Sequence, residues 1–191
     1  GISAYGHQAR FLGYFDDQVD NFYFRGLECT TNDNLSVEEM IRMTMRTGDM
    51  SVDVMKKLDE ANTNTYKNPT VHKVNVKREK GPFIIVSGHD LRDLEMLLQQ
   101  TEGKGINIYT HGEMIPSHGY PELKKYKHLV GNYGGAWQDQ QKEFDGIPGC
   151  ILMTTNCLMR PRETYKDRIF TTSVVGWDGV KYIPADKDGH K

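Results

Sequence analysis

The sequence predicts an α/β protein: a Rossmann-like parallel sheet domain preceded by a helical segment. Two observations carry this prediction. Up to residue 78, apolar residues recur at intervals of three and four, which is typical of amphipathic helices. After Pro82, short apolar runs alternate with loops and helical patterns, the order expected of a doubly wound parallel sheet. We therefore expect a helical segment over residues 1–78 and a Rossmann-like domain over residues 79–191.

The helical segment is expected to hold three or four short helices. Ser36 and Ser51 are placed to begin two of them as N-caps, and Glu39, three residues after Ser36, completes a capping box. The helical patterns cover residues 2–15, 16–30, 36–48 and 51–66. Residues 67–82 follow as a connector, with alternating valines, a basic run and the pair Gly81-Pro82.

The second domain is expected to alternate strands and helices. Leucines spaced along residues 90–103 predict an amphipathic helix long enough to be a right-handed crossover between parallel strands. Two further helices are expected over residues 121–128, where Pro121 lies in the first turn, and 136–144. The predicted strands cover residues 83–88, 106–111, 129–134, 150–156 and 168–175, and the last of these closes the series.

Composition excludes several classes of function. Lys+Arg 24 against Asp+Glu 26 gives a net charge of -2, so no nucleic-acid surface is indicated. No apolar run approaches the roughly 20 residues of a membrane helix. The 3 cysteines include no CxxC pair, which favours a reducing, cytoplasmic compartment over a disulfide framework. No signal peptide or initiating Met is visible, which leaves open that the chain is part of a longer protein.

Three potential metal ligands of different chemistry each follow a predicted strand. They are His89, Glu113 and Cys157. Because the carboxyl ends of parallel strands meet at one edge of a sheet, we expect an imidazole, a carboxylate and a thiolate to converge there. Two of these residues also have an ordinary explanation: His89 as a side chain that caps the helix or bonds to backbone, and Glu113 as a solvated loop carboxylate. Cys150 and Cys29 are expected to be small buried side chains.

Three chemistries fit this donor set. It suits a catalytic zinc site with a water as fourth ligand, although zinc motifs usually have tighter local spacing. It also suits a Cys-His-Glu nucleophilic triad, although no nucleophile elbow accompanies Cys157, or the open edge of an iron cluster. His111 and His118 are nearby side chains that could orient Glu113. The run 131–137 departs from GxGxxG and indicates dinucleotide binding only weakly.

Longer motifs resemble a known family. GPFIIVSGHDLRDLE, YTHGEMIPSHGYPELKKYKHLVGNYGGAWQDQQKEF, GCILMTTNCL and YKDRIFTTSVVGWDGV are similar to the hybrid cluster proteins, also called prismane proteins or hydroxylamine reductases. The helical stretch from ISAYGHQARFLGY resembles the second half of that family's N-terminal helical domain. The resemblance implies that His89, Glu113 and Cys157 are ligands of a hybrid iron-sulfur-oxygen cluster.

The same resemblance implies a function and a larger parent. The expected reaction is reduction of hydroxylamine to ammonia and water, with Glu113 as the catalytic ligand that moves, because a carboxylate leaves iron more easily than a thiolate. Reduction of nitric oxide or peroxide, or a metal-free domain binding a ligand or partner, are the alternatives. The remaining cluster ligands, and those of a second cubane cluster, would lie in missing N- and C-terminal portions, and a redox donor is implied as partner.

Overall fold

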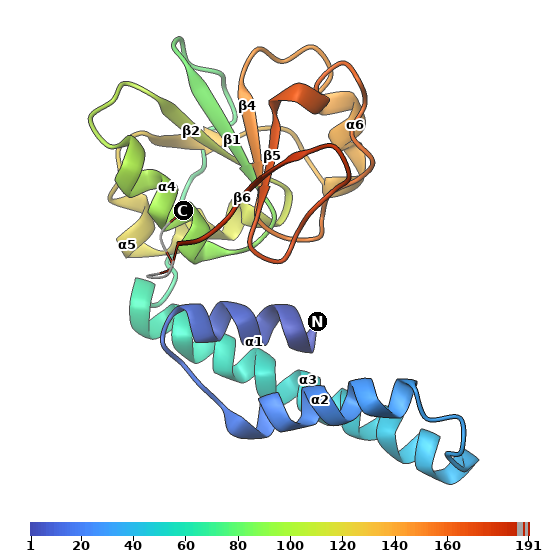
Figure 1. The fold of residues 1–191 in the computed structure, drawn as a ribbon. Coiled ribbons are helices and arrows are strands. Elements are labelled where there is room, and N and C mark those ends of the chain that lie inside the picture. Colours follow the sequence, from blue (N-terminus) through green and yellow to red (C-terminus); the bar gives the residue numbers. More distant parts are fainter. Residues whose placement is uncertain (187–188, 190) are drawn as a thin grey trace. The chain divides into compact units, whose positions relative to one another are not determined.

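The computed structural model describes all residues except 187, 188 and 190. The chain forms two compact units, Gly1–Thr65 and Tyr66–Lys191. The first is helical, and the second holds a six-stranded parallel sheet with flanking helices (Figure 1). The predicted fold class, a Rossmann-like α/β domain preceded by helices, is confirmed. The division at residue 78, as a domain boundary of a longer protein, stays a prediction.

The first unit is built from three helices, α1 (Ile2–Phe11), α2 (Asp17–Thr30) and α3 (Val37–Tyr66). Asp16 caps α2, where its carboxylate accepts hydrogen bonds from two backbone N–H groups of the first turn. The core is small and contains Val19, Met50 and Val54.

The two expected helices over 36–66 are one continuous helix. Ser36 and Glu39 form the predicted capping box, with Ser36 N donating to Glu39 Oε2 at 2.8 Å and Glu39 N to Ser36 Oγ at 3.3 Å. The prediction that Ser51 is an N-cap is wrong, because its hydroxyl donates to the Thr47 carbonyl inside α3. No proline interrupts this stretch, and a single interior glycine, Gly48, costs only about 1 kcal/mol.

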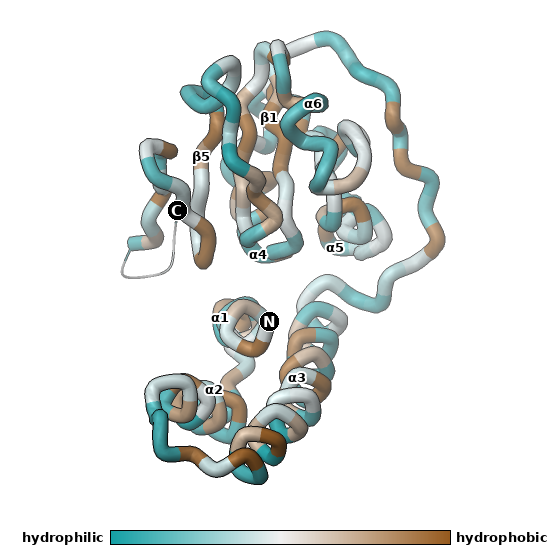
Figure 2. The backbone as a smooth tube through the Cα atoms, turned by 90° about the vertical axis from the view of Figure 1, so that its right-hand side faces the viewer, coloured by the Kyte–Doolittle hydropathy of each residue, from teal (hydrophilic) through white to brown (hydrophobic). Residues whose placement is uncertain are grey.

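The connector, residues 67–82, contains neither helix nor strand. Figure 2 shows it as the long path from the end of α3 to the start of β1. It lies along the outer edge strand, where the Asn75 carbonyl accepts a hydrogen bond of 2.8 Å from Asn132 N. Gly131 permits this approach, because a Cβ at that position would meet the Asn75 oxygen at 2.2 Å. The connector therefore contacts this sheet edge through the backbone of Asn75, whereas two of its alternating valines, Val71 and Val76, are exposed.

The sheet has the order β3-β2-β1-β4-β5-β6, and all its pairs are parallel. The strands are β1 (Phe83–Ser87), β2 (Asn107–His111), β3 (Leu129–Asn132), β4 (Cys150–Met153), β5 (Ile169–Thr172) and β6 (Lys181–Ile183). Their core includes Ile85, Ile151, Ile169, Phe144 and Tyr165, and Figure 2 shows hydrophobic residues along β1 at the centre of the sheet. Strand order reverses between β1 and β4, which is where open α/β sheets place their ligand sites.

The elements between strands differ in length from those expected. Helix α4 (Leu91–Thr101) forms as predicted, but α5 (Pro121–Lys124) and α6 (Gln140–Glu143) have only four residues each. Three short 3-10 segments complete the connections: η1 (Gly112–Gly119), η2 (Trp137–Asp139) and η3 (Lys166–Arg168). Strand β6 was not predicted. Among the described residues, no helix is both long and apolar enough to cross a membrane.

Candidate metal centre

Two of the three donors are delivered by strands that end in the same way. Ser87 and His111 are paired in register as the last residues of β1 and β2. Each is followed by a glycine with positive φ, Gly88 at +104° and Gly112 at +60°. His89 and Glu113 come next. The glycines turn the backbone away from the strand direction in conformations that other residues adopt only with strain, and the two donors emerge beside each other.

The third donor reaches this edge from β4. Thr154 follows the strand, and both its N–H and its hydroxyl donate to the Ser87 carbonyl, at 3.0 and 3.1 Å. The loop passes so close to Gly88 that a Cβ there would lie 2.5 Å from Thr154 Oγ1 and 2.8 Å from Thr155 N. The loop that leads to Cys157 is therefore packed against Gly88, the residue that precedes His89.

The donor atoms of His89, Glu113 and Cys157 all lie within 4.8 Å of one another. Cys157 Sγ donates a hydrogen bond of 2.9 Å to Glu113 Oε2, and Thr155 Oγ1 lies 3.7 Å from the same sulfur. His89 and Cys157 are half-buried, whereas Glu113 is exposed. The structure thus brings together the three residues that the strand-end pattern singled out.

Burial and this hydrogen bond set the protonation states. Burial, followed by the hydrogen bond to Glu113, raises the pKa of Cys157 to about 11. Burial lowers the pKa of His89, partly offset by the nearby Glu113 charge, so the imidazole is neutral near pH 7. A neutral imidazole is the form that binds metal, and a metal ion would displace the proton that the thiol shares with the carboxylate.

These protonation states help to distinguish the chemistries that the sequence left open for the three donors. A cysteine nucleophile needs a lowered thiol pKa and a base that takes its proton. In this chain, burial and the hydrogen bond to the Glu113 carboxylate both favour the protonated form of the Cys157 thiol. The site therefore does not provide the activated thiolate that a nucleophilic triad needs. The dinucleotide interpretation of residues 131–137 also gains no support, because the Gly135 N–H donates to Glu143 Oε1 at 2.7 Å.

The capping explanation for His89 is wrong. Asp90 is the N-cap of α4, with Oδ1 accepting from Arg92 N at 3.0 Å and from Asp93 N at 3.1 Å. Its carboxyl group is buried, and this burial, followed by the charge of Asp93, raises the pKa of Asp90 to about 7. His89 lies just before the cap, on the side of the metal-ligand cluster.

The other expected side chains lie elsewhere. Among the described residues, His111 and His118 form their hydrogen bonds with partners other than the Glu113 carboxylate: His111 bonds Ser87 and Glu143, and His118 bonds Thr110 and the backbone of Gly131. Cys150 is exposed, so its predicted burial is wrong; it begins β4, whereas the donors lie beyond the opposite ends of the strands. Cys29 is only half-buried, also contrary to its predicted burial.

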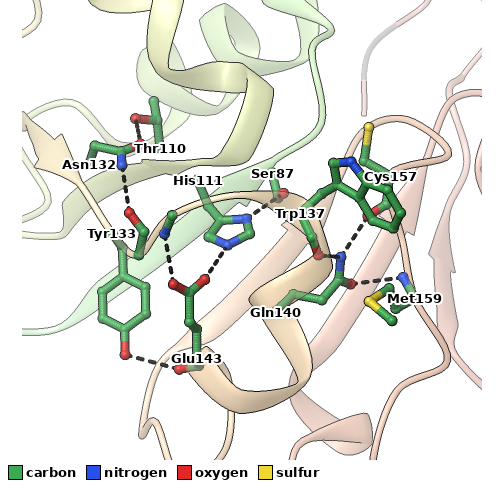
Figure 3. Close-up of polar contacts among 12 residues, drawn as sticks. Ser87, Thr110, His111, Asn132, Tyr133, Trp137, Gln140, Glu143, Cys157 and Met159 are labelled. Carbon is green, nitrogen blue, oxygen red and sulfur yellow. Dashed lines mark hydrogen bonds and ion pairs between the residues drawn. The ribbon is translucent and has the colours of Figure 1, made fainter.

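Sequence reasoning missed two residues on α6, Gln140 and Glu143. Gln140 contacts the loop of Cys157, and Glu143 contacts His111, two residues before Glu113 (Figure 3). Their only signal in the sequence is a spacing of three within a presumed helix, which many polar pairs share.

Fold and site together define a class: a doubly wound α/β protein with a mixed nitrogen, oxygen and sulfur donor set at its topological switch point. The chain belongs to the Prismane/CO dehydrogenase family, whose model matches residues 1–191. The resemblance inferred from the motifs is thereby confirmed.

Several curated relatives are named hydroxylamine reductase. The protein from Desulfitobacterium hafniense is 54% identical over 189 residues, covering 99% of this chain and 34% of its own length. The protein from Kosmotoga olearia is 56% identical over 189 residues, covering 99% and 34%. That from Caldanaerobacter subterraneus is 53% identical over 191 residues, covering 100% and 35%. The chain therefore spans about a third of the length of these relatives.

Proposed function

We propose that the protein to which this chain belongs is an iron-sulfur oxidoreductase that reduces hydroxylamine to ammonia and water. The observation that carries this proposal is the convergence of three chemically different donor atoms within 4.8 Å at the switch point of the sheet. In the reaction, one hydroxylamine takes up two electrons and two protons, the N–O bond breaks, and one ammonia and one water form. The relatives' names supply the substrate.

The donor set fits part of a hybrid iron-sulfur-oxygen cluster. Thiolate and imidazole are ordinary ligands of iron-sulfur centres, and a carboxylate leaves a coordination position more open than an all-cysteine cage does. When bound, the cluster supplies the electrons and the iron that takes the substrate. His89 would bind iron through neutral imidazole, Glu113 through its carboxylate and Cys157 through a thiolate.

Glu113 is proposed to be the catalytic member of the set. It is the exposed donor, whereas the other two are half-buried. A carboxylate is also the hard ligand among the three, so it is displaced from iron more readily than a thiolate. Movement of Glu113 on the first turn of η1 would open space for a nitrogen or oxygen ligand beside His89 and Cys157.

The proposed reaction also needs further cluster ligands and a source of electrons, which the described part of this chain does not supply. Further ligands of this cluster, and those of a second, cubane cluster, would come from the N- and C-terminal portions. Electrons would come from a redox partner. We also propose a cytoplasmic location, because the chain's 3 cysteines are all free thiols, as a reducing compartment maintains them.

The test uses the full-length protein purified without oxygen. We expect iron, acid-labile sulfide and hydroxylamine-dependent oxidation of a reduced viologen dye, with one ammonia formed per two dye molecules. Cys157→Ser should lose cluster iron and activity together, because a serine hydroxyl replaces a thiolate poorly. Cys150→Ser is the matched control, since Cys150 is exposed at the start of β4 and should leave both unchanged.

Three results would each reject a part of the proposal. If Cys157→Ser retains its iron, or if both serine variants lose it equally, the ligand assignment is wrong. If the loaded protein oxidises the dye with nitric oxide or peroxide but not with hydroxylamine, the substrate is wrong. A protein without iron and sulfide would favour a metal-free domain that binds a ligand or partner.

A further inference from the structure

Helix α6 directs two polar side chains toward the donor loops. Gln140 and Glu143 are three residues apart and therefore lie on the same side of the helix. Gln140 is 1% exposed, and the Glu143 side chain is 21% exposed. Figure 3 shows each of them at the centre of its own group of hydrogen bonds. Buried amide and carboxylate groups are costly unless they are bonded, so these contacts are specific features of the fold.

Gln140 holds the backbone on both sides of the residue after Cys157. Its Nε2 donates to the Cys157 carbonyl at 2.7 Å and to the Trp137 carbonyl at 2.6 Å. Its Oε1 accepts from Met159 N at 2.9 Å. One side chain thus fixes the carbonyl of the donor residue and an N–H two residues later. This fixes the backbone from which Cys157 Sγ reaches Glu113.

Glu143 holds the strand end that leads to Glu113. Its Oε2 accepts from His111 Nε2 at 2.9 Å, and its Oε1 accepts from Gly135 N at 2.7 Å. With Nε2 as the donor to Glu143, the other ring nitrogen, Nδ1, accepts the Ser87 hydroxyl at 2.8 Å. The ring of His111 is therefore tied at both nitrogens, to β1 on one side and to α6 on the other.

We infer that α6 is a positioning element for the metal centre: Gln140 sets the place of Cys157, and Glu143, through His111, sets the place of Glu113. The two donors are 44 residues apart in sequence. Helix α6 bonds the backbone of one donor, Cys157, and His111, the strand end two residues before the other donor. Outer partners of this kind orient metal ligands in other proteins. The inference rests on the proposed function, because it needs the three donors to bind metal.

An ordinary structural role would give the same hydrogen bonds. The chain offers a matched comparison. Gln141, the next residue, donates through Nε2 to the Arg160 carbonyl at 2.7 Å, the same type and length of bond to the same loop. It reaches a point three residues beyond Cys157, and it is not bonded to the donor residue itself. If α6 merely anchors the loop, removing Gln141 should have the effect of removing Gln140.

The experiment titrates the 191-residue chain with Co²⁺ alone and follows the thiolate-to-cobalt charge-transfer absorption. The wild-type chain should show this band, and Cys157→Ser should abolish it. Gln140→Ala and Glu143→Gln should each weaken Co²⁺ binding by about 10–100-fold and shift the band, whereas Gln141→Ala should match the wild type. Glu143→Gln is informative because one amide oxygen cannot accept from both His111 and Gly135, so an N–H must face one of these donors.

Folding is followed separately for each variant by thermal unfolding. Gln140→Glu adds a second form of the test, because it keeps the size of the side chain and the oxygen for Met159 N while it loses both N–H donors. Equal Co²⁺ affinity in the wild type and in folded Gln140→Ala, Gln140→Glu and Glu143→Gln would overturn the inference and leave the ligand assignment intact. Equal weakening by Gln141→Ala would overturn it as well. A wild-type chain without the cobalt band would reject the ligand assignment and the inference together.

Discussion

Gly88 joins β1 to the first donor, and its replacement by alanine should destabilise the α/β unit more than a glycine substitution at a simple turn. Its φ of +104° is a conformation that residues with a Cβ rarely adopt, and that strain costs about 1–3 kcal/mol. The new methyl group would also lie 2.8 Å from the backbone nitrogen of Thr155. A backbone atom cannot rotate away, so overpacking adds about 1–3 kcal/mol.

Gly103→Ala separates the two costs. Gly103 has φ +72° and no atom within 4 Å of an added Cβ, so only the conformational cost of about 1–2 kcal/mol applies there. The free energy of unfolding should therefore fall by about 2–6 kcal/mol in Gly88→Ala, clearly more than in Gly103→Ala.

Tryptophan fluorescence during urea unfolding measures this difference. Both tryptophans of the chain, Trp137 and Trp177, belong to the α/β unit, so the signal reports that unit and not the helical one. If Gly88→Ala loses no more stability than Gly103→Ala, the close packing of the Cys157 loop against the strand end that leads to His89 is refuted.

Three further predictions concern pH, the isolated chain and Glu113. Burial and the neighbouring His72 lower the pKa of His118 from 6.5 to about 4 in the folded chain. Between pH 6.5 and pH 4 the unfolded chain therefore binds a proton that the folded chain does not bind. The contribution of His118 to the free energy of unfolding is complete above pH 6.5 and is lost as the pH falls toward 4. Urea unfolding at pH 5 and pH 7.5 should show His118→Gln losing up to about 2 kcal/mol less than the wild type on acidification, and equal losses would contradict the shift. The 191-residue chain, even after reconstitution with iron and sulfide, should not oxidise a reduced dye with hydroxylamine, because three ligands cannot complete a multi-iron cluster; sustained activity abolished by His89→Ala would disprove this. In the full-length protein, Glu113→Gln should retain more iron than Cys157→Ser while turnover slows, as iron analysis beside the dye assay would reveal, and greater iron loss in Glu113→Gln would argue against a displaceable carboxylate.

Features with a strong local signal were predictable from the sequence. The apolar runs of β1, β2 and β4 identified buried strands, since in parallel sheets both faces are covered. The leucine spacing identified α4, and the Ser36–Glu39 pair identified the start of α3. In each case the residues that create the signal lie within one or two turns of each other, so no knowledge of the tertiary structure was needed.

Features without such a signal were not predictable. Helices α5 and α6 are too short to show a helical period, because a single turn contributes little stability of its own and depends on its surroundings. Strand β6 buries none of its three residues and exists through its pairing with β5. The exposure of Cys150 follows from its place at the very beginning of β4, which an apolar run does not reveal.

The sequence by itself determined the fold class and named the three donors, because strands in a doubly wound sheet end at a common edge and the residues after them must meet there. Only the tertiary structure decided how those donors are held. The bonds Ser87–His111, His111–Glu143 and Gln140–Cys157 join residues 24, 32 and 17 positions apart. Hydrogen bonds between distant residues depend on where several elements come to rest together, and no local pattern of residues encodes that arrangement.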